Sequence, residues 1–355
     1  MATQDLLAVD PDIHAMRHSL RDYIDTKIHA DIKSKTWLRI VVKGLYQRSG
    51  GAHIFTHEKT DKIFNWHRPT TIVKDDSTLV VACFPGRDYV QHYYWLITLH
   101  LSFCGNDHTV VELDLPPHNA CLDIFLESNL GLMGDIHTVI LGYTQQILEE
   151  GVGWETGTAN ENQLFSWHKI HTPDDREVAY LGCLVSFWGD ISGQLIHALQ
   201  KLNKVNCVLY IGKAGSLHAE DHPNQVIATN GSSFIQGQLL SWNSVLCNAL
   251  DEVKLRAVHR GVHVNVVSPL EESFTWLSEW KGKADYVDCE VGHIALACLE
   301  QQTSFGYLHI ISDNVAKYYP QNLADERDLR VTEARKKLFS QIRAIISIFL
   351  GLNSK

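Results

Sequence analysis

One stretch near the carboxyl end, residues 284–315, constrains the fold more than any other part of the sequence. Its letters, ADYVDCEVGHIALACLEQQTSFGYLHIISDNV, predict a short approach, a buried helix, a turn and an apolar strand. The strand ends in Ser312-Asp313-Asn314, and Glu290 lies where the helix begins. In open α/β sheets, strand ends and neighbouring helix starts line the ligand crevice. Two acids placed there, in otherwise apolar segments, are candidates for chemistry.

A regular alternation of strands and helices extends over the carboxyl-terminal part of the chain, which we delimit as residues 134–355. Long apolar runs between helices are typical of a sheet that is buried on both faces. We therefore predict an α/β fold, a three-layer sandwich around a mixed and largely buried sheet. Strands are expected at 137–143, 164–170, 177–189 and 205–217, and helices at 190–202, 236–260 and roughly 323–350.

Residues 1–133 follow a less regular pattern, and we predict an additional amino-terminal segment of α/β or α+β type, whose function the sequence leaves open. Its aromatic stretch at 88–103 is compatible with stacking on a ligand and with packing in a core. The turn FPGRD at 84–88 is compatible with anion binding and with a plain turn. We expect a helix over 12–48, strands at 79–84 and 108–115, and a helix around 119–128.

The composition excludes several classes of protein. A net charge of −10 is opposite to the clustered Lys and Arg that nucleic-acid binding requires. No apolar run approaches about 18 residues, so we expect no transmembrane helix, and the first residues lack the pattern of a secretory signal. Eight cysteines without a CxxC pair indicate reduced thiols and a cytoplasmic protein. His218 and His222 have a zinc-ligand spacing, but Pro223 favours a loop, and we expect no metal site.

Six segments within residues 137–345 resemble, in the same order, the nucleoside phosphorylase superfamily of phosphorylases and nucleosidases. These enzymes cleave the N-glycosidic bond of nucleosides and transfer ribose to phosphate or to water. The resemblance implies a nucleoside-like small-molecule substrate, a homo-oligomer, and no cofactor other than phosphate as a co-substrate. The segments are LFSWHKIHTPDDREVAYLGCLVSFWGD, LYIGKAGSL, QVIATNGSSF, VVSPLEESF, YVDCEVGHIA and LHIISDN.

The resemblance assigns distinct roles to the two acids. As the glycosidic bond breaks, the sugar gains oxocarbenium character and electrons move into the base. Glu290 matches the glutamate that accepts hydrogen bonds from the ribose 2′ and 3′ hydroxyls; the alternative is a solvated carboxylate at a helix start. Asp313, oriented by Ser312, matches the aspartate that donates a proton toward purine N7. The alternative for Asp313 is a turn residue that forms a cap with Asn314, whereas Asp288 is expected to be a cap or a structural partner.

Other residues match the parts of the family's site that contact substrate. A glycine follows the first strand of the domain, and a GxxG turn follows a later strand, where backbone amides can approach the nucleophile and ribose. Phe274 falls where the family often places an aromatic ring that stacks on the base, although a core phenylalanine fits equally well. The cysteine beside Glu290 is a weaker candidate for a nucleophile, with His293 as its partner. The residues assigned to substrate binding are Gly142, Gly212, Lys213, Gly215, Phe274, Cys289 and Ser312.

The sequence departs from the phosphorylases where they bind phosphate. Their first glycine loop carries an arginine, but the loop here reads Gly142-Tyr143-Thr144-Gln145-Gln146, and Tyr210 replaces a second arginine. Lys213 supplies a point charge without the bidentate fork of an arginine. We therefore expect hydrolysis or an atypical acceptor rather than ordinary phosphorolysis. The alternative is a non-catalytic nucleoside-binding or structural protein that keeps the fold. Whether an arginine reaches the site from elsewhere stays open for Arg87, Arg256 and Arg260.

Overall fold

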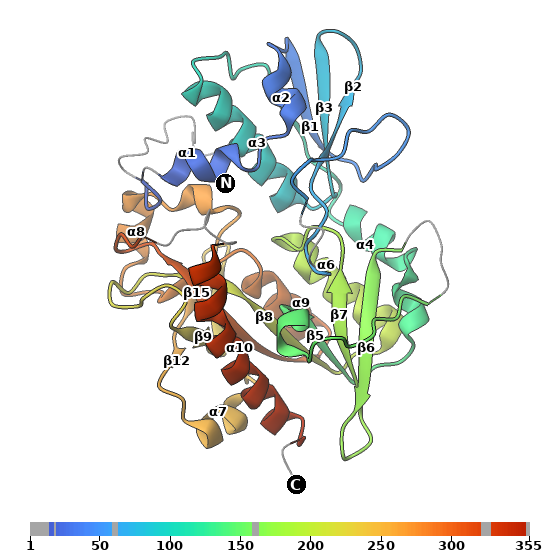
Figure 1. The fold of residues 1–355 in the computed structure, drawn as a ribbon, viewed down its shortest axis with the longest axis vertical. Helices are drawn as coiled ribbons and strands as arrows, with labels where there is room; N and C mark the ends of the chain where they lie inside the picture. Colours follow the sequence, from blue (N-terminus) through green and yellow to red (C-terminus); the bar gives the residue numbers. More distant parts are fainter. Residues whose placement is uncertain (1–13, 18, 59–62, 158–162, 321–327, 353–355) are drawn as a thin grey trace.

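The computed structural model describes residues 14–17, 19–58, 63–157, 163–320 and 328–352. Figure 1 shows a smaller sheet of amino-terminal strands and a larger sheet of later strands, each accompanied by helices. The helices are α1 (Ser19–Asp25), α2 (Ala30–Ser34), α3 (Arg87–Phe103), α4 (Ala120–Leu126), η3 (Asn129–Met133), α5 (Thr144–Ile147), α6 (Asp190–Asn203), α7 (Cys247–Val253), η4 (Pro269–Glu271), α8 (Phe274–Trp280), α9 (Val291–Glu300) and α10 (Leu329–Phe349). The strands are β1 (Arg39–Gly44), β2 (Thr70–Val73), β3 (Thr78–Cys83), β4 (Val111–Asp114), β5 (Thr138–Gly142), β6 (Phe165–His171), β7 (Glu177–Cys183), β8 (Cys207–Ser216), β9 (Ile227–Thr229), β10 (Ser232–Ile235), β11 (Gln238–Ser241), β12 (Val258–Arg260), β13 (His263–Asn265), β14 (Tyr286–Asp288) and β15 (Ser304–Asn314).

The larger sheet is mixed and has β8 at its centre. β8 pairs in parallel with β5 and with β15, and β14 pairs antiparallel with its carboxyl end. From β8 the sheet continues through β14, β13, β10 and β11 in one direction and through β15, β9 and β12 in the other. β5 pairs in parallel with β7, which forms an antiparallel hairpin with β6. The carboxyl ends of β5, β8 and β15 therefore meet at one edge of the sheet.

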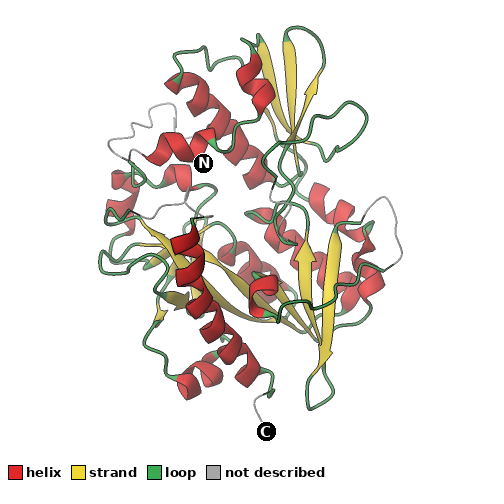
Figure 2. Cartoon of the chain, in the orientation of Figure 1, coloured by secondary structure: helices red, strands yellow, loops and turns green. Residues whose placement is uncertain are grey.

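Helices cover both faces of this sheet. Val208 and Tyr210 of β8 belong to the same hydrophobic core as buried residues of α6 and α9. The alternate residues Leu209 and Ile211 belong to a second core with α7 and α10. This alternation is what a strand buried on both faces requires. Figure 2 shows α10 crossing one face of the sheet. The predicted α/β three-layer sandwich is confirmed.

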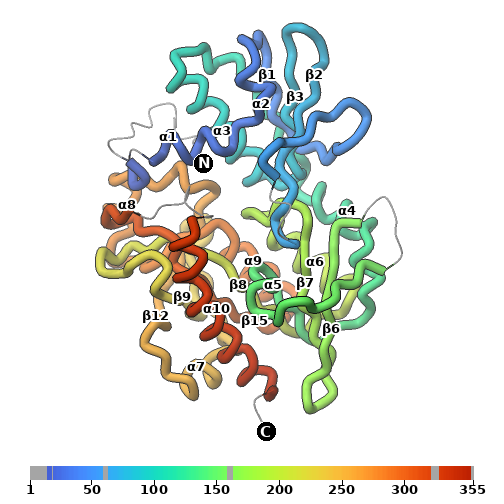
Figure 3. Tube along the Cα trace, in the orientation of Figure 1, coloured from blue at the N-terminus to red at the C-terminus, as the bar shows by residue number. Residues whose placement is uncertain are grey.

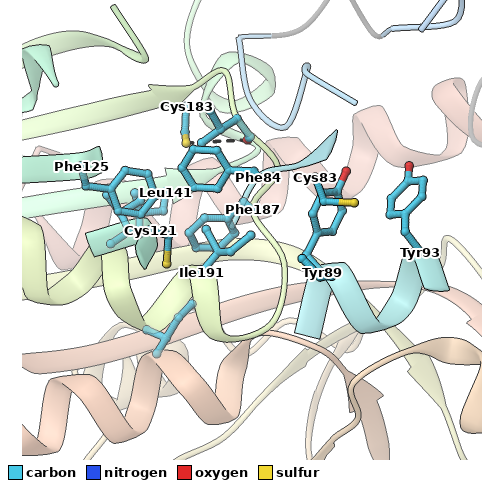
Figure 4. Close-up of a cluster of buried hydrophobic side chains, with 14 of the residues drawn as sticks. Cys83, Phe84, Tyr89, Tyr93, Cys121, Phe125, Leu141, Cys183, Phe187 and Ile191 are labelled. Atoms are coloured by element: carbon cyan, nitrogen blue, oxygen red, sulfur yellow. Dashed lines mark hydrogen bonds between the residues drawn. The ribbon is translucent and has the colours of Figure 1, made fainter. Parts of the chain in front are cut away.

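The smaller sheet has the order β2-β3-β1-β4, in which β1 is parallel to β3 and β4. The predicted strands near 79–84 and 108–115 correspond to β3 and β4. The two sheets share one hydrophobic core, part of which appears in Figure 4. There Phe84 stacks on Phe125 with 5.4 Å between ring centroids, and Leu141 of β5 lies in the same cluster. A division of the chain between residues 133 and 134 therefore stays a prediction.

The predicted helix over 12–48 is wrong for its second half. Within the described residues, two short helices, α1 and α2, are followed by the strand β1. The run Ile40-Val41-Val42 consists of β-branched residues, whose side chains favour a pleated strand over a helix. Its burial alternates, with Ile40 and Val42 buried and Val41 half-buried. The segment is apolar, but its burial alternates with a period of two, which is typical of a strand and not of a helix.

The predicted helix over 236–260 is also wrong, because only α7 is helical there. Gln236 and Gly237 have φ values of 50° and 78°, which form a tight turn between the antiparallel strands β10 and β11. A hairpin thus occupies the start of the segment and β12 its end. The predicted final helix corresponds to α10, and residues 323–327 of that prediction lie outside the described residues.

Candidate active site

A cavity of about 190 Å³ lies at the edge where β5, β8 and β15 end. Because these strands are parallel neighbours, residues distant in the sequence meet there. Of the nine residues predicted for the site, Phe274 alone is not part of the lining. The predicted residues that line the cavity are Gly142, Gly212, Lys213, Gly215, Cys289, Glu290, Ser312 and Asp313.

Asp313 owes its orientation to a β-bulge. Ile311 pairs with Ala214, but Asp313 pairs with Gly215, so Ser312 is an extra residue in β15. A bulge bends a strand and re-aims its side chains. The Ser312 hydroxyl donates a hydrogen bond of 2.7 Å to Asp313 Oδ1, and a Cβ atom on Gly215 would lie 3.2 Å from Asp313 Oδ2. Burial raises the pKa of Asp313, although Ser312, Lys213 and Arg335 partly oppose this effect.

Glu290 is held at the start of α9 by its neighbour Asp288. Asp288 Oδ2 accepts the backbone N–H groups of Glu290, the N-cap residue of α9, at 3.2 Å and of Val291 at 2.9 Å. Burial raises the pKa of Glu290, and the adjacent charge of Asp288 raises it further, whereas Lys213 lowers it. Burial also raises the pKa of Asp288 to about 7.

Two of the glycines are required by close approach of the chain. Gly142 has a φ of 95°, and a Cβ atom there would lie 1.9 Å from the carbonyl oxygen of Ile211. A Cβ atom on Gly212 would lie 2.8 Å from the hydroxyl of Tyr210 and 2.7 Å from Nε2 of His309. The chain can pass through the site only without side chains at these two positions.

Tyr210, at the position where the sequence resemblance implied a second arginine, lies beside Glu290. Burial, followed by the nearby charges of Glu290 and Asp288, raises the pKa of Tyr210, so its phenol keeps the proton. A hydrogen bond with Tyr210 lowers the pKa of Glu290 and thereby favours its ionised form. At this position the cavity therefore has a neutral hydrogen-bond donor, the phenol of Tyr210.

The amino-terminal segment supplies a wall of the cavity that the sequence did not predict. α3 carries three aromatic residues at helical spacing, Tyr89, His92 and Tyr93, and the ring of His92 stacks on Trp188 at 4.3 Å. Their spacing was visible in the sequence, but it suits a core equally well. Two cations, Lys27 and Arg68, lie in the same wall. The lining residues from this segment are Tyr23, Lys27, Ile63, Phe64, Asn65, Arg68, Tyr89, His92 and Tyr93.

Glu272, a buried acid of the carboxyl-terminal part, also lines the cavity and was not predicted from the sequence. Glu272 follows the short helix η4, and its backbone carbonyl accepts a hydrogen bond of 2.9 Å from the N–H of Ala15. Figure 3 shows this junction, where the start of the described chain lies beside α8. Burial raises the pKa of Glu272, and the charge of Asp313 raises it further. No periodic pattern around residue 272 signals such a position.

A cluster of charged groups joins α3 to α6 and α9. Asp190 Oδ2 accepts the N–H of Arg87 at 2.9 Å, and Asp88 Oδ2 accepts the N–H of Asp190 at 3.2 Å. Asp88 Oδ2 also lies 2.8 Å from Nε2 of His293, which is in the first turn of α9. Burial would lower the pKa of His293, but Asp88 and other carboxylates outweigh it and raise that pKa. Two walls of the cavity are thereby connected.

Other residues weighed from the sequence lie elsewhere. Phe274 contacts Arg17, with 5.4 Å from the guanidinium to the ring centroid, and its stacking role stays a prediction. Arg87 donates to the carbonyl of Pro116 at 2.8 Å, and Arg260 pairs with Asp251 at 2.5 Å, so neither lines the cavity. Across the described ranges, no three His, Cys, Asp or Glu side chains gather as metal ligands. No helix among these residues is long and apolar enough to cross a membrane.

Comparisons with known proteins give similarity in structure but not in sequence. No protein family model matches the sequence, and no curated protein matches it. Among solved structures, the 5′-methylthioadenosine/S-adenosylhomocysteine nucleosidase of Campylobacter jejuni has 12% identity and a TM-score of 0.46, covering 61% of this chain and 99% of its own. The nucleosidase of the same type from Helicobacter pylori has 17% identity and a TM-score of 0.45, covering 61% and 99%. The futalosine hydrolase of Helicobacter pylori has 16% identity and a TM-score of 0.45, covering 62% and 98%. The solved structures to which this protein is similar thus include nucleosidases and a hydrolase of the nucleoside phosphorylase superfamily, the group that its sequence motifs resemble.

Proposed function

We propose that the protein is an enzyme that cleaves the N-glycosidic bond of a purine-type nucleoside or a related ribosyl compound. The observation that carries this proposal is the meeting of Glu290 and Asp313 in one cavity, although they belong to different elements. Lys213 acts on both, because its charge lowers the pKa of each carboxyl group. Their different surroundings suit different roles.

In the proposed reaction Asp313 is the general acid and Glu290 holds the sugar. Burial raises the pKa of Asp313, which favours a carboxyl group that still carries a proton to deliver to the base. Burial and Asp288 raise the pKa of Glu290, and Lys213 and Tyr210 oppose that rise. In its ionised form Glu290 accepts hydrogen bonds from two ribose hydroxyls. When the bond from the anomeric carbon to the base nitrogen breaks, the base leaves with the Asp313 proton. Water supplies the oxygen that bonds to the anomeric carbon, and its released proton restores the acid.

Water or an atypical acceptor is favoured over ordinary phosphorolysis. The chain after β5 contributes Gln145 and Gln146 to the cavity lining, and β8 contributes Tyr210. These side chains donate hydrogen bonds but carry no charge, whereas a phosphate ion is bound most strongly by charged donors. We therefore propose hydrolysis as the reaction at this part of the site.

A second candidate is a nucleoside-binding protein without turnover, and the Tyr210 substitution favours it. A phenol bonded to Glu290 preserves a polar ligand site whether or not chemistry follows. The two candidates differ in whether base is released, and the variant Asp313→Asn separates them. An enzyme loses turnover in this variant while it keeps affinity for the ligand; a binding protein has no turnover to lose.

The test is the release of free base from adenosine, inosine, guanosine and 5′-methylthioadenosine, with and without phosphate, followed by liquid chromatography. Release without phosphate, lost in Asp313→Asn and Glu290→Gln, is the expected result. Asp251→Asn is the matched control, because Asp251 is an exposed carboxylate outside the cavity. Absence of base release at high enzyme concentration from all four nucleosides would overturn the catalytic proposal.

A further inference from the structure

We propose that the amino-terminal segment supplies a site for a phosphate group, formed by Arg68 and Lys27 together with the tyrosine hydroxyls beside them. The group belongs either to a nucleotide substrate or to free inorganic phosphate. The inference rests on the proposed function for the identity of the remaining ligand, the ribose and base at Glu290 and Asp313. It gives the amino-terminal segment a role in recognition.

Charge is divided between the two sides of the cavity. The lining carboxyl groups all come from residues after 268, and Lys213 is the cation beside them, whereas among the described residues before 134 the charged lining groups are the cations Lys27 and Arg68. A phosphate group is therefore favoured on the amino-terminal side, where no lining carboxyl group opposes the two cations. Ribose hydroxyls and a purine ring are suited to the carboxyl side, where they donate and accept hydrogen bonds. The lining carboxyl groups are Glu272, Asp288, Glu290 and Asp313.

The chain around Arg68 is anchored in a way that fixes this side chain. Its guanidinium donates a hydrogen bond of 3.0 Å to Asn65 Oδ1, and its backbone N–H donates one of 2.9 Å to Glu58 Oε1. Glu58 in turn accepts two hydrogen bonds, of 2.8 and 2.7 Å, from the guanidinium of Arg48. A guanidinium held in this way presents a planar fork to a phosphate at a small entropic cost.

Four aromatic side chains lie within electrostatic reach of Arg68. Burial raises the pKa of the tyrosines, and the charge of Arg68 partly opposes this effect; burial lowers the pKa of the histidine, and the charge of Arg68 lowers it further. The tyrosine hydroxyls therefore keep their protons and can donate to phosphate oxygens. Lys27 lies at the same place, with its ammonium 4.6 Å from the ring centroid of Tyr23. The four side chains are Tyr23, Tyr89, His92 and Tyr93.

The chemistry of this wall favours a phosphate group over an uncharged substituent. An apolar group would shut water away from two cations, which is costly. A phosphate group replaces that water with charged oxygens, and it accepts hydrogen bonds from the guanidinium, the ammonium and the phenols at once. Such charge-assisted bonds strengthen as water is excluded.

The experiment compares adenosine 5′-monophosphate with adenosine, in binding and in turnover. Dissociation constants are measured by calorimetry on Asp313→Asn, alone and combined with Arg68→Gln, Lys27→Gln or Arg39→Gln. Arg39 is the matched control, because it is an exposed cation of the same segment that pairs with Glu112 outside the cavity. Base release by the protein with its native Asp313 is measured for both compounds, with and without inorganic phosphate, and in each of the three cation variants. Circular dichroism checks that each variant is folded, and Lys27→Gln keeps the test available if Arg68→Gln does not fold.

Two results support the site and distinguish the source of the phosphate. A nucleotide substrate is indicated if the monophosphate binds at least roughly tenfold more tightly than adenosine, which is the scale of a charge-assisted hydrogen bond, and if Arg68→Gln or Lys27→Gln removes the preference while Arg39→Gln keeps it. Free phosphate is indicated if inorganic phosphate binds, or accelerates base release from adenosine, and the same two variants abolish that effect.

The proposal is overturned if neither compound shows a phosphate effect, or if Arg39→Gln changes it as much as the cavity variants do. Phosphate-dependent binding without any base release would instead count against the proposed function and leave this site intact. Base release that depends neither on phosphate nor on Lys27 and Arg68 would overturn this phosphate site and leave the proposed function intact.

Discussion

Asp88 of α3 accepts a hydrogen bond from the first turn of α6, and Asp190 of α6 accepts one from the first turn of α3. Asp190 Oδ2 accepts the N–H of Arg87 at 2.9 Å, and Asp88 Oδ2 accepts the N–H of Asp190 at 3.2 Å. The first four N–H groups of a helix have no partner within it, so this exchange satisfies donors at both α3 and α6. It also links α3, which precedes residue 134, to α6, which follows it.

Two substitutions of Asp190 should distinguish the effect of its hydrogen bonds on stability from the effect of its negative charge. Asp190→Ala removes Oδ2, which accepts the N–H of Arg87, and Oδ1, which accepts the N–H of Asp88. The free energy of unfolding should fall by about 2 kcal/mol, the upper end for a lost cap. Asp190→Asn keeps one acceptor and removes a charge that lies beside Asp88, so its loss should be clearly smaller. Urea denaturation of the two variants measures the difference. Equal stability of both variants and the native protein would contradict the reciprocal cap.

The pH dependence of the free energy of unfolding should show the contribution of Asp190. Burial, then the charge of Asp88, raises the pKa of Asp190 from 3.8 to about 6. The folded state therefore binds the proton more tightly than the unfolded state, and stability contributed by Asp190 falls as pH rises from about 4 to 6. Asp190→Asn should show a shallower decline over this interval. The check is the free energy of unfolding measured in urea at several pH values; parallel curves for the two proteins would be the contrary result.

Catalysis should have a basic limb set by Asp313. Burial raises the pKa of its carboxyl group, and the proposed general acid works only while protonated. The value of kcat/KM for base release should therefore fall as pH rises through this raised pKa. Asp313→Asn should lose roughly 100-fold to 10,000-fold in rate, the usual contribution of a general acid, and its residual activity should lack that limb. An unchanged profile in Asp313→Asn would assign the proton to another group.

Gly142 should be intolerant of any side chain. Its φ of 95° and a Cβ position 1.9 Å from the Ile211 carbonyl oxygen combine strain with a clash of backbone atoms. Gly142→Ala should cost about 4 kcal/mol or prevent folding, which places it among the most severe substitutions. Gly153→Ala is the control, since that glycine has open space around its Cβ position and no positive φ. Thermal denaturation that affects both variants alike would argue against the close approach.

Tyr210→Phe should test how the hydrogen bond from Tyr210 affects the protonation of Glu290. Without the hydroxyl, the pKa of Glu290 should rise further, because the hydrogen bond that lowers it is lost. We expect KM for a nucleoside to increase roughly threefold to tenfold, the scale of one net hydrogen bond, with a smaller effect on kcat. Tyr180→Phe, in the other hydrophobic core, should leave KM unchanged. A fall in kcat alone would contradict the assigned binding role.

The sequence was most informative where the pattern is local. Long apolar runs identified β8 and β15, and the acids at the strand end and helix start were placed on their correct elements. The bulge at Ser312 could not be foreseen, because it depends on pairing with a strand about a hundred residues earlier. The error over 12–48 has a different origin, since the β-branched run at 40–42 is short enough to suit either period.

The amino-terminal wall shows why the remaining lining was missed. Tyr23, Arg68 and Tyr93 come from separate elements and loops, and no spacing in the sequence relates them to Asp313. Their convergence follows from the shared hydrophobic core that joins the two sheets. Glu272 illustrates the same limit, because its backbone carbonyl accepts a hydrogen bond from Ala15, near the start of the described chain.

The contact of Asp88 with His293 has a consequence for selectivity. His293 lies three residues after Glu290, so its contact of 2.8 Å with Asp88 connects the wall carried by α3 to the helix at whose start Glu290 lies. A ligand therefore meets a gap whose width was set during folding, and little of its binding free energy is used to draw the walls together. We expect compounds that contact only one of the two walls to bind more weakly than compounds that contact both.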